Sequence, residues 1–145
     1  MVGVGASDRQ APEVPEVAGS DLLVPVRLSP TFAALEDAVW ATNDAVLLDL
    51  CRIRLGQLVG RDLVARHAPP EQVAALRRWP TDPAFSAGER AVLDFCEHYA
   101  IDPHTVTDEQ VALLHEHFDE PTLAALTTGV AFFDAVVRVA NAQES

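Results

Sequence analysis

Apolar residues recur at intervals of three and four along most of the chain, which is the spacing of amphipathic helices. Ser29-Pro30 suits the N-cap and the first position of a helix. Phe32, Leu35 and Val39 then follow at helical spacing. The pattern therefore predicts a helix that begins at residue 30.

A second helix is predicted over residues 45–60, where Asn43 or Asp44 can act as the N-cap and Gly60 ends the run. Residues 63–68 extend this helical pattern after a possible cap at Asp62, and two prolines then end it. A further helix is predicted over residues 71–79.

Two capping boxes mark later helices, because each places Ser or Thr three residues before Glu or Gln. The first is Ser86 with Glu89, and the second is Thr107 with Gln110. The last apolar run, residues 120–142, is apolar on more than one side and indicates a central or interface helix. No run alternates with period two, so the predicted fold class is all-α with about six helices.

The length of 145 residues fits one domain. Residues 1–20 are rich in Gly, Pro, Ala and Glu without periodicity, and we expect a flexible N-terminal arm there. Residues 24–28 are expected to be a short extended link or at most a strand. A single helical domain is predicted over residues 21–145.

The formal net charge is −12, and all ten basic residues are arginine. Neutralising a phosphate backbone requires Lys and Arg, so we expect neither nucleic acid nor an anionic membrane as a partner. Residues 52–78 nevertheless contain six arginines and only two acidic residues. These arginines can attract an anionic ligand, or they can pair with acidic side chains of this subunit or of a neighbour.

The two cysteines, Cys51 and Cys96, both lie in apolar runs, where a buried structural thiol is the commoner interpretation. The N-terminus lacks the basic and apolar regions of a secretory signal, and no long uncharged apolar run indicates a membrane span. A cytoplasmic location is therefore expected.

Three runs together carry a resemblance to a known family: LLDLCRIRLGQLVGRDLVARH, RRWPTDPAFSAGERAVLDFCE and HFDEPTLAALTTGVAFFDAVVRVANA. In this order they cover residues 45–142, and they resemble the carboxymuconolactone decarboxylase and alkylhydroperoxidase D-like (AhpD-like) superfamily. The resemblance implies an all-helical fold and self-association as a dimer, trimer or hexamer.

The sequence departs from the redox members of that family, which carry Cys-x-x-Cys after the long helix. The two cysteine positions fall on Arg61 and Val64, and the position of the family glutamate falls on Asp49. His67 lies one residue short of the family histidine. Peroxide or disulfide chemistry needs two sulfurs in succession, so a Cys-x-x-Cys peroxidase is disfavoured.

Asp49, Arg61 and His67 map to the pocket that the resemblance implies, near the end of the long helix. Asp49 and His67 are candidate catalytic residues, because a carboxylate and an imidazole can transfer protons. Arg61 is a candidate substrate-binding residue that can hold a carboxylate or an enolate. The alternatives are a salt bridge between Asp49 and Arg52, a helix-end role for His67, and a surface position for Arg61.

No cofactor is expected. Nor is a metal expected, because His115 and His117 are two positions apart and face different sides of a helix. Three hypotheses about function follow. The first is a cofactor-independent acid–base enzyme of lyase, isomerase or decarboxylase type, acting on a small anionic or carbonyl-bearing metabolite. The second is a non-catalytic ligand-binding or oligomeric partner protein, and the third is residual thiol peroxidase activity through Cys51 or Cys96.

Overall fold

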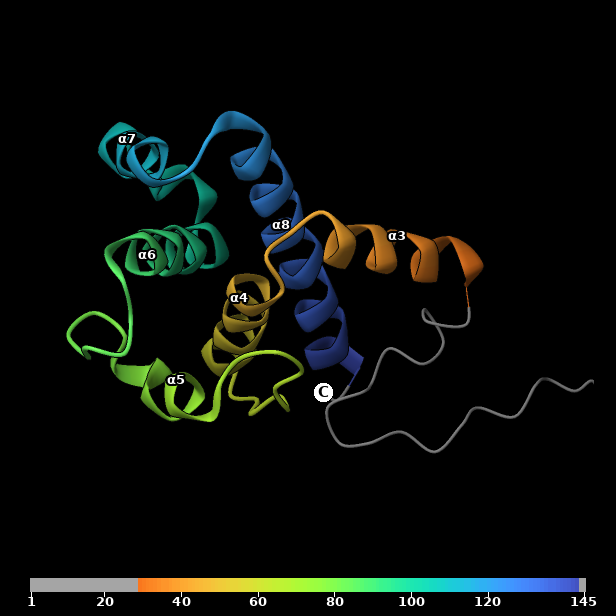
Figure 1. The fold of residues 1–145 in the computed structure, drawn as a ribbon. Coiled ribbons are helices and arrows are strands. Elements are labelled where there is room, and N and C mark those ends of the chain that lie inside the picture. The colour runs from red at the N-terminus through yellow and green to blue at the C-terminus, as the bar shows by residue number, and fades with distance from the viewer. Residues whose placement is uncertain (1–28, 144–145) are drawn as a thin grey trace, which may run out of the picture.

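The computed structural model describes residues 29–143, which form six α-helices and two short 3₁₀ helices without a β-strand in that range. The elements are α3 (Pro30–Ala41), α4 (Ala45–Leu58), α5 (Pro70–Ala75), η1 (Leu76–Arg78), α6 (Ala87–Ile101), η2 (Pro103–Thr105), α7 (Asp108–His117) and α8 (Glu120–Gln143) (Figure 1). The predicted all-α class with six helices is confirmed. The expected arm, residues 1–20, and the link, residues 24–28, lie outside the described residues.

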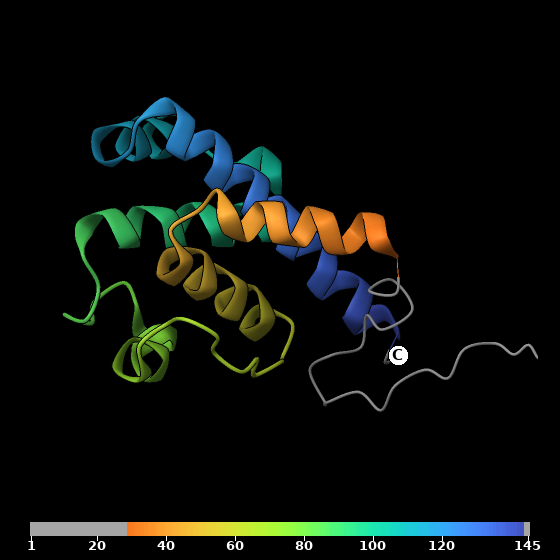
Figure 2. The same ribbon diagram turned by 45° about the vertical axis from the view of Figure 1, so that its right-hand side comes forward.

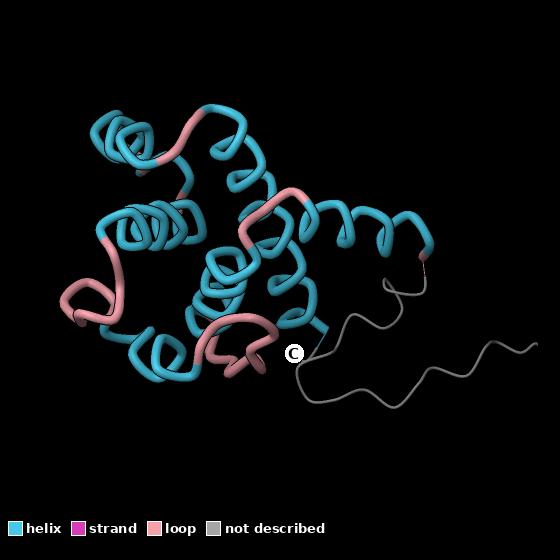
Figure 3. The backbone as a smooth tube through the Cα atoms, viewed as in Figure 1, coloured by secondary structure: helices cyan, strands magenta, loops and turns pink. Residues whose placement is uncertain are grey.

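Helix α4 is the centre of the fold, because apolar layers cover it on two sides. On one side it packs against α6 and α8, and this layer includes Leu48, Val92 and Val130, none of which is exposed. On the other side Leu50 and Ile53 of α4 pack with a second apolar cluster from α5, η1 and the loop before α6. Figure 3 shows α4 enclosed by other helices and by the loop that follows it.

Helix α8 buries one face, at positions three and four residues apart from Leu123 to Ala140. Helix α3 lies across it, with Phe32 stacked on Phe132 at 5.3 Å between ring centroids (Figure 2). The sequence pattern indicated a central or interface helix for residues 120–142. In this chain α4 is more completely enclosed, and α8 keeps part of its apolar surface exposed, such as Val139.

Helix α8 is long and apolar enough to cross a membrane, with a mean hydropathy of 1.6 over an 18-residue stretch. Within the protein, 39% of that stretch is buried. The core helix of a water-soluble domain meets the same two criteria. Part of the apolar composition of α8 is explained by the buried face that packs against α4.

Local side-chain caps define the predicted helix starts. Ser29 accepts the N–H of Phe32, and Asp44 accepts the N–H of Leu47. Both predicted capping boxes are present, at the start of α6 and at the start of α7. These caps are formed by residues three apart, and for that reason the sequence alone predicted them correctly.

The predicted helical continuation over residues 63–68 is wrong, because this part of the chain has no helical turn. The chain leaves α4 through Gly60, which has a φ of 82°, and the N–H of Arg61 bonds to the carbonyl of Gly56. Residues 61–69 then run back along α4 without helix or strand and bend at residues 66–68; they are here called the return segment. Its backbone is bonded to side chains of α4 rather than to itself.

Substituting Gly60 with alanine is expected to lower the free energy of unfolding by about 1–2 kcal/mol, the cost of a left-handed conformation for a residue with a Cβ. No atom lies within 4 Å of the added Cβ, so the effect is conformational rather than steric. Gly88→Ala is the matched control, because its Cβ meets ordinary contacts at 3.5 Å. Urea denaturation of both variants measures the difference, and equal stabilities would contradict the prediction.

Candidate functional site

The carboxylate of Asp49 is buried at the junction between α4 and the return segment. Its Oδ2 accepts backbone N–H groups from Arg66, His67 and Ala68 at 2.7, 2.7 and 2.9 Å. Its Oδ1 accepts from Nε of Arg52 at 3.0 Å. Arg52 in turn donates to the carbonyl oxygen of Val64. Asp49 and Arg52 together fasten the return segment to α4.

This coordination keeps Asp49 ionised. Burial raises the pKa of the carboxyl group, but hydrogen bonds from the backbone of His67, Ala68 and Arg66 and the charge of Arg52 outweigh it, and the net pKa is lowered. A general base that works near neutral pH needs a pKa closer to that range. The geometry thus gives Asp49 an anchoring role, and its catalytic role stays an untested prediction.

His67 is exposed, and its contact with Asp49 runs through the backbone N–H. The imidazole ring lies 5.0 Å from the ring of Trp40. Arg66 also lies over Trp40, at 5.8 Å, and forms an ion pair with Glu36 at 3.0 Å. A small cavity of about 360 Å³ opens here between α3 and Arg66. The His67 ring therefore lies beside Trp40 and Arg66, which line this polar cavity. The carboxylate oxygens of Asp49 bond to Arg52 and to backbone N–H groups, not to the imidazole.

Arg61 lies at the start of the return segment and contacts the end of α8, where its guanidinium donates to the carbonyl oxygen of Ala140 at 3.5 Å. Val64, at the second cysteine position of the redox family, is 74% exposed. The structure joins two of the three predicted site residues, Asp49 on α4 and His67 on the return segment, through one backbone hydrogen bond. The guanidinium of Arg61 instead contacts the end of α8.

The arginines of residues 52–78 pair mainly within the subunit. Arg54 bonds to Glu97 at 2.6 Å, and Arg77 bonds to Asp62 at 2.6 Å. Arg78 bonds to Asp82 at 3.3 Å. For this basic stretch, the structure shows arginines that pair with acidic side chains of the same subunit.

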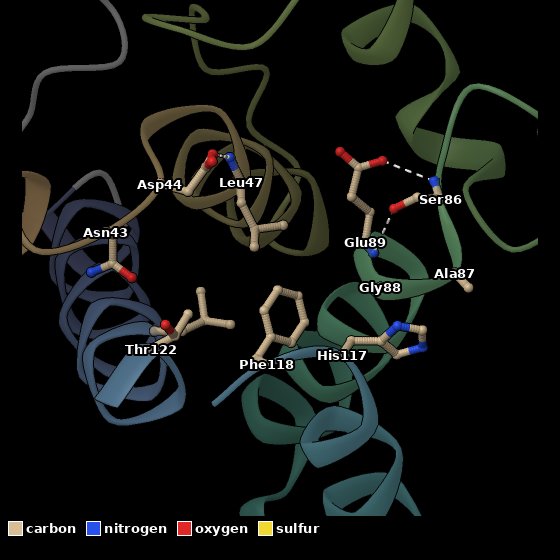
Figure 4. A pocket seen from close by; sticks show the side chains of 11 residues that line it. Asn43, Asp44, Leu47, Ser86, Ala87, Gly88, Glu89, His117, Phe118 and Thr122 are labelled. Atoms are coloured by element: carbon tan, nitrogen blue, oxygen red, sulfur yellow. Dashed lines mark hydrogen bonds between the residues drawn. The ribbon is translucent and has the colours of Figure 1, made fainter. Parts of the chain in front are cut away.

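A cleft of about 690 Å³ lies where α4, α6 and α8 begin (Figure 4). We call it the N-terminal cleft. Leu47, Phe118 and Leu126 supply apolar lining. In Figure 4 the ring of Phe118 points between Leu47 and the first turn of α6. The remaining lining residues are Asn43, Asp44, Ser86, Ala87, Gly88, Glu89, His117 and Thr122.

The helix caps determine the polar character of this cleft. Asp44 accepts the N–H of Leu47 at 2.9 Å. Glu89 accepts from the N–H of Ser86 at 2.9 Å and from the amide of Gln72 at 3.1 Å. These carboxylates favour a ligand group that donates hydrogen bonds or carries positive charge.

Sequence reasoning missed this cleft. Its residues were identified as helix caps and turns, which is correct, but their convergence depends on how three helix starts meet in space. The two capping motifs at Asp44 and Ser86 were the available signal. Such caps occur at most helix starts, so they did not distinguish a cavity.

Both cysteines are buried in the core with no exposed surface. A hydrogen bond with Cys51 and burial raise the pKa of Cys96 well above its ordinary value, so Cys96 is a protonated thiol at neutral pH. Thiol peroxidases need an accessible thiolate. Within residues 29–143, no three His, Cys, Asp or Glu side chains are grouped so that they could hold a metal ion.

No family model matches the sequence, and no curated protein matches it. A solved structure does match: a protein of unknown function from Agrobacterium tumefaciens, described as a putative antioxidant defence protein AhpD. The TM-score is 0.70 at 18% identity, and the match covers 83% of this chain and 93% of that chain. The likeness shows the fold, so the predicted AhpD-like helical fold is confirmed.

Replacing Asp49 with asparagine is expected to lower the free energy of unfolding by about 3–5 kcal/mol, because Arg52 and three N–H groups lose a buried anion. Asp62→Asn is the matched control: its side chain is 84% exposed, and we expect a change within about 0.5 kcal/mol. Urea denaturation at neutral pH measures both. Similar losses in the two variants would refute the anchoring role.

The lowered pKa of Asp49 also predicts the direction of a pH effect. A carboxyl with a lower pKa in the folded state stabilises the fold fully above its unfolded pKa, near 3.8, and loses this effect as the pH falls through the folded pKa. The urea midpoint of the wild type should therefore fall more steeply below about pH 4 than that of Asp49→Asn. Parallel curves for the two proteins would contradict this.

Proposed function

We propose that this chain is a small-molecule-binding protein of AhpD-like fold that does not catalyse thiol-based redox reactions. The burial of both sulfur atoms in the core supports this proposal. The positions where redox relatives of the resembled family keep their cysteine pair are occupied here by Arg61 and by Val64. Neither side chain can attack a peroxide or a disulfide. Binding and proton transfer are the functions that remain for this site.

The N-terminal cleft is the proposed ligand site, because a large cavity with apolar lining and a few fixed polar groups is where small molecules bind in most proteins. Its volume of about 690 Å³ suits a metabolite. Phe118 and Leu47 would contact an apolar body, and Asp44 and Glu89 would accept hydrogen bonds from its polar end. This selects an uncharged or cationic ligand over the anionic one that the sequence suggested.

The test is a ligand screen of purified protein by native mass spectrometry, for co-purified molecules, and by thermal shift with a panel of metabolites. Gly88→Trp fills the cleft from the first turn of α6, because a Cβ at this position faces the lining residues His117 and Phe118 at 3.5 Å. Ala112→Trp is the control on the exposed side of α7, outside the cleft. Ligands should raise the melting temperature of the wild type and of Ala112→Trp, but not of Gly88→Trp. Equal shifts in all three proteins would place the ligand elsewhere.

A second candidate function is the cofactor-independent acid–base enzyme of lyase, isomerase or decarboxylase type. The observation that favours it is the exposed imidazole of His67 beside Arg66 and a cavity of about 360 Å³. In this proposal His67 moves the proton, Arg61 or a neighbouring arginine holds an anionic substrate, and Asp49 positions His67 through its backbone.

Enzyme activity can be separated from binding by one comparison. His67→Gln should abolish any turnover of a ligand found in the screen while it leaves thermal stability unchanged, because the His67 ring is exposed. His115→Gln, on the exposed side of α7, is the control and should keep full activity. Turnover that survives His67→Gln would reject His67 as the proton carrier.

Self-association remains a proposal. We propose that a second copy of the chain covers apolar side chains that α3 and α8 leave on the surface, such as Leu35 at 49% and Val139 at 41% exposure. Light scattering coupled to size-exclusion chromatography should give a dimer, trimer or hexamer for the wild type and a smaller species for the double variant Leu35→Glu, Val139→Glu. A monomeric wild type would contradict this.

A further inference from the structure

The two cysteines lie 45 positions apart in the sequence but meet in the core. Cys51 is on α4 and Cys96 is on α6, two helices that pack directly against each other. The Sγ atom of Cys96 lies 3.9 Å from the backbone oxygen of Cys51. Both thiols belong to the same apolar cluster, and neither is exposed. The Cys96 thiol thus points at the part of α4 that carries Cys51.

These positions matter because α4 and α6 also form two walls of the N-terminal cleft. A covalent bond between Cys51 and Cys96 would fix the spacing of these helices about one turn from the cleft residue Leu47 on α4 and about two turns from the cleft residue Glu89 on α6. None of the contacts that fasten the return segment to Asp49 involves either cysteine. The thiol pair is thus independent of the Asp49 anchor.

We propose that Cys51 and Cys96 are a concealed dithiol that closes to an intramolecular disulfide, joining α4 to α6, when a two-electron oxidant such as a hydroperoxide reaches the core. The geometry of two neighbouring thiols on packed helices carries this inference. It is a modification of the protein, not a catalytic cycle.

The reaction balances in two steps. One thiolate attacks the hydroperoxide, the O–O bond breaks, and a sulfenic acid and an alcohol form. The second thiol then attacks the sulfenic sulfur, so that the S–S bond forms and water leaves. Two electrons pass from the sulfurs to the peroxide, and the two thiol protons end in the alcohol and in water. A diazene oxidant such as diamide takes the same two electrons and two protons.

Burial determines when this reaction can occur. Both sulfurs are shielded from solvent, and the Cys96 thiol is protonated at neutral pH, so the closed fold reacts slowly. Transient separation of α4 and α6 admits the oxidant, and the thiols are neighbours again when the helices close. The disulfide therefore forms only after the helices have opened, and it then persists until it is reduced.

The test oxidises the full chain with diamide in urea below the unfolding midpoint, where circular dichroism still reports native helix content. Free thiols are blocked, and the protein is digested with trypsin without reduction. Cleavage after arginine leaves Cys51 in residues 28–52 and Cys96 in residues 91–138, so the disulfide joins these two peptides. We expect this linked pair in the monomer, a mass loss of two hydrogen atoms, and a higher urea midpoint of the oxidised protein.

The matched control moves one thiol to another buried face of the same helix, in the double variant Cys51→Ala, Ile53→Cys. Ile53 is 1% exposed and lies in the second apolar cluster, away from Cys96. This variant should give at least roughly tenfold less linked peptide under the same conditions, because disulfide geometry demands neighbouring sulfurs. The single variant Cys96→Ala should give none.

The proposal would be overturned by linkage only in fully unfolding urea, by linkage between chains instead of within one, or by equal linkage in the wild type and in the double variant. Thiols that stay free throughout the native range, although they are blocked readily in full denaturant, would overturn it as well.

Discussion

The buried carboxylate of Asp49 is the interaction on which the arrangement of the candidate sites depends. One oxygen accepts three consecutive backbone N–H groups of the return segment, and the other accepts from Arg52, which binds that segment again at Val64. A carboxylate without these partners would be costly at zero exposure. With them, it holds the return segment against the central helix. The positions of Arg66 and His67 follow from this attachment.

The same contacts determine which chemical role Asp49 can have. A residue that is ionised, buried and hydrogen-bonded on both oxygens organises a site better than it exchanges protons with a ligand. His67 and Arg66 are instead presented outward, against Trp40 and Glu36. The region that the sequence resemblance assigns to a thiol site is thus a segment that carries exposed arginine and histidine side chains. The cleft of about 690 Å³ lies at the start of α4, where three helix starts meet around Phe118.

The sulfur atoms complete this picture. The redox members of the resembled family place two cysteines after the long helix, whereas this chain places its two cysteines inside the helix packing. A buried thiol packs as a small apolar side chain and contributes to the core. Sulfur chemistry here therefore depends on the opening of the fold, while ligand chemistry depends on the cleft and on the exposed edge.

The sequence by itself determined the helices, because apolar spacing and caps act between residues three or four apart. The capping boxes of α6 and α7 and the resemblance to an AhpD-like fold were predicted from such local patterns, and both are confirmed. Only the tertiary structure decided the course of residues 61–69, because their backbone partners lie 12 to 19 positions away on α4. It also decided the meeting of Cys51 with Cys96 and the convergence of Asp44, Glu89 and Phe118. Local propensity carries no information about such distant pairs, since their contacts form only when the helices pack.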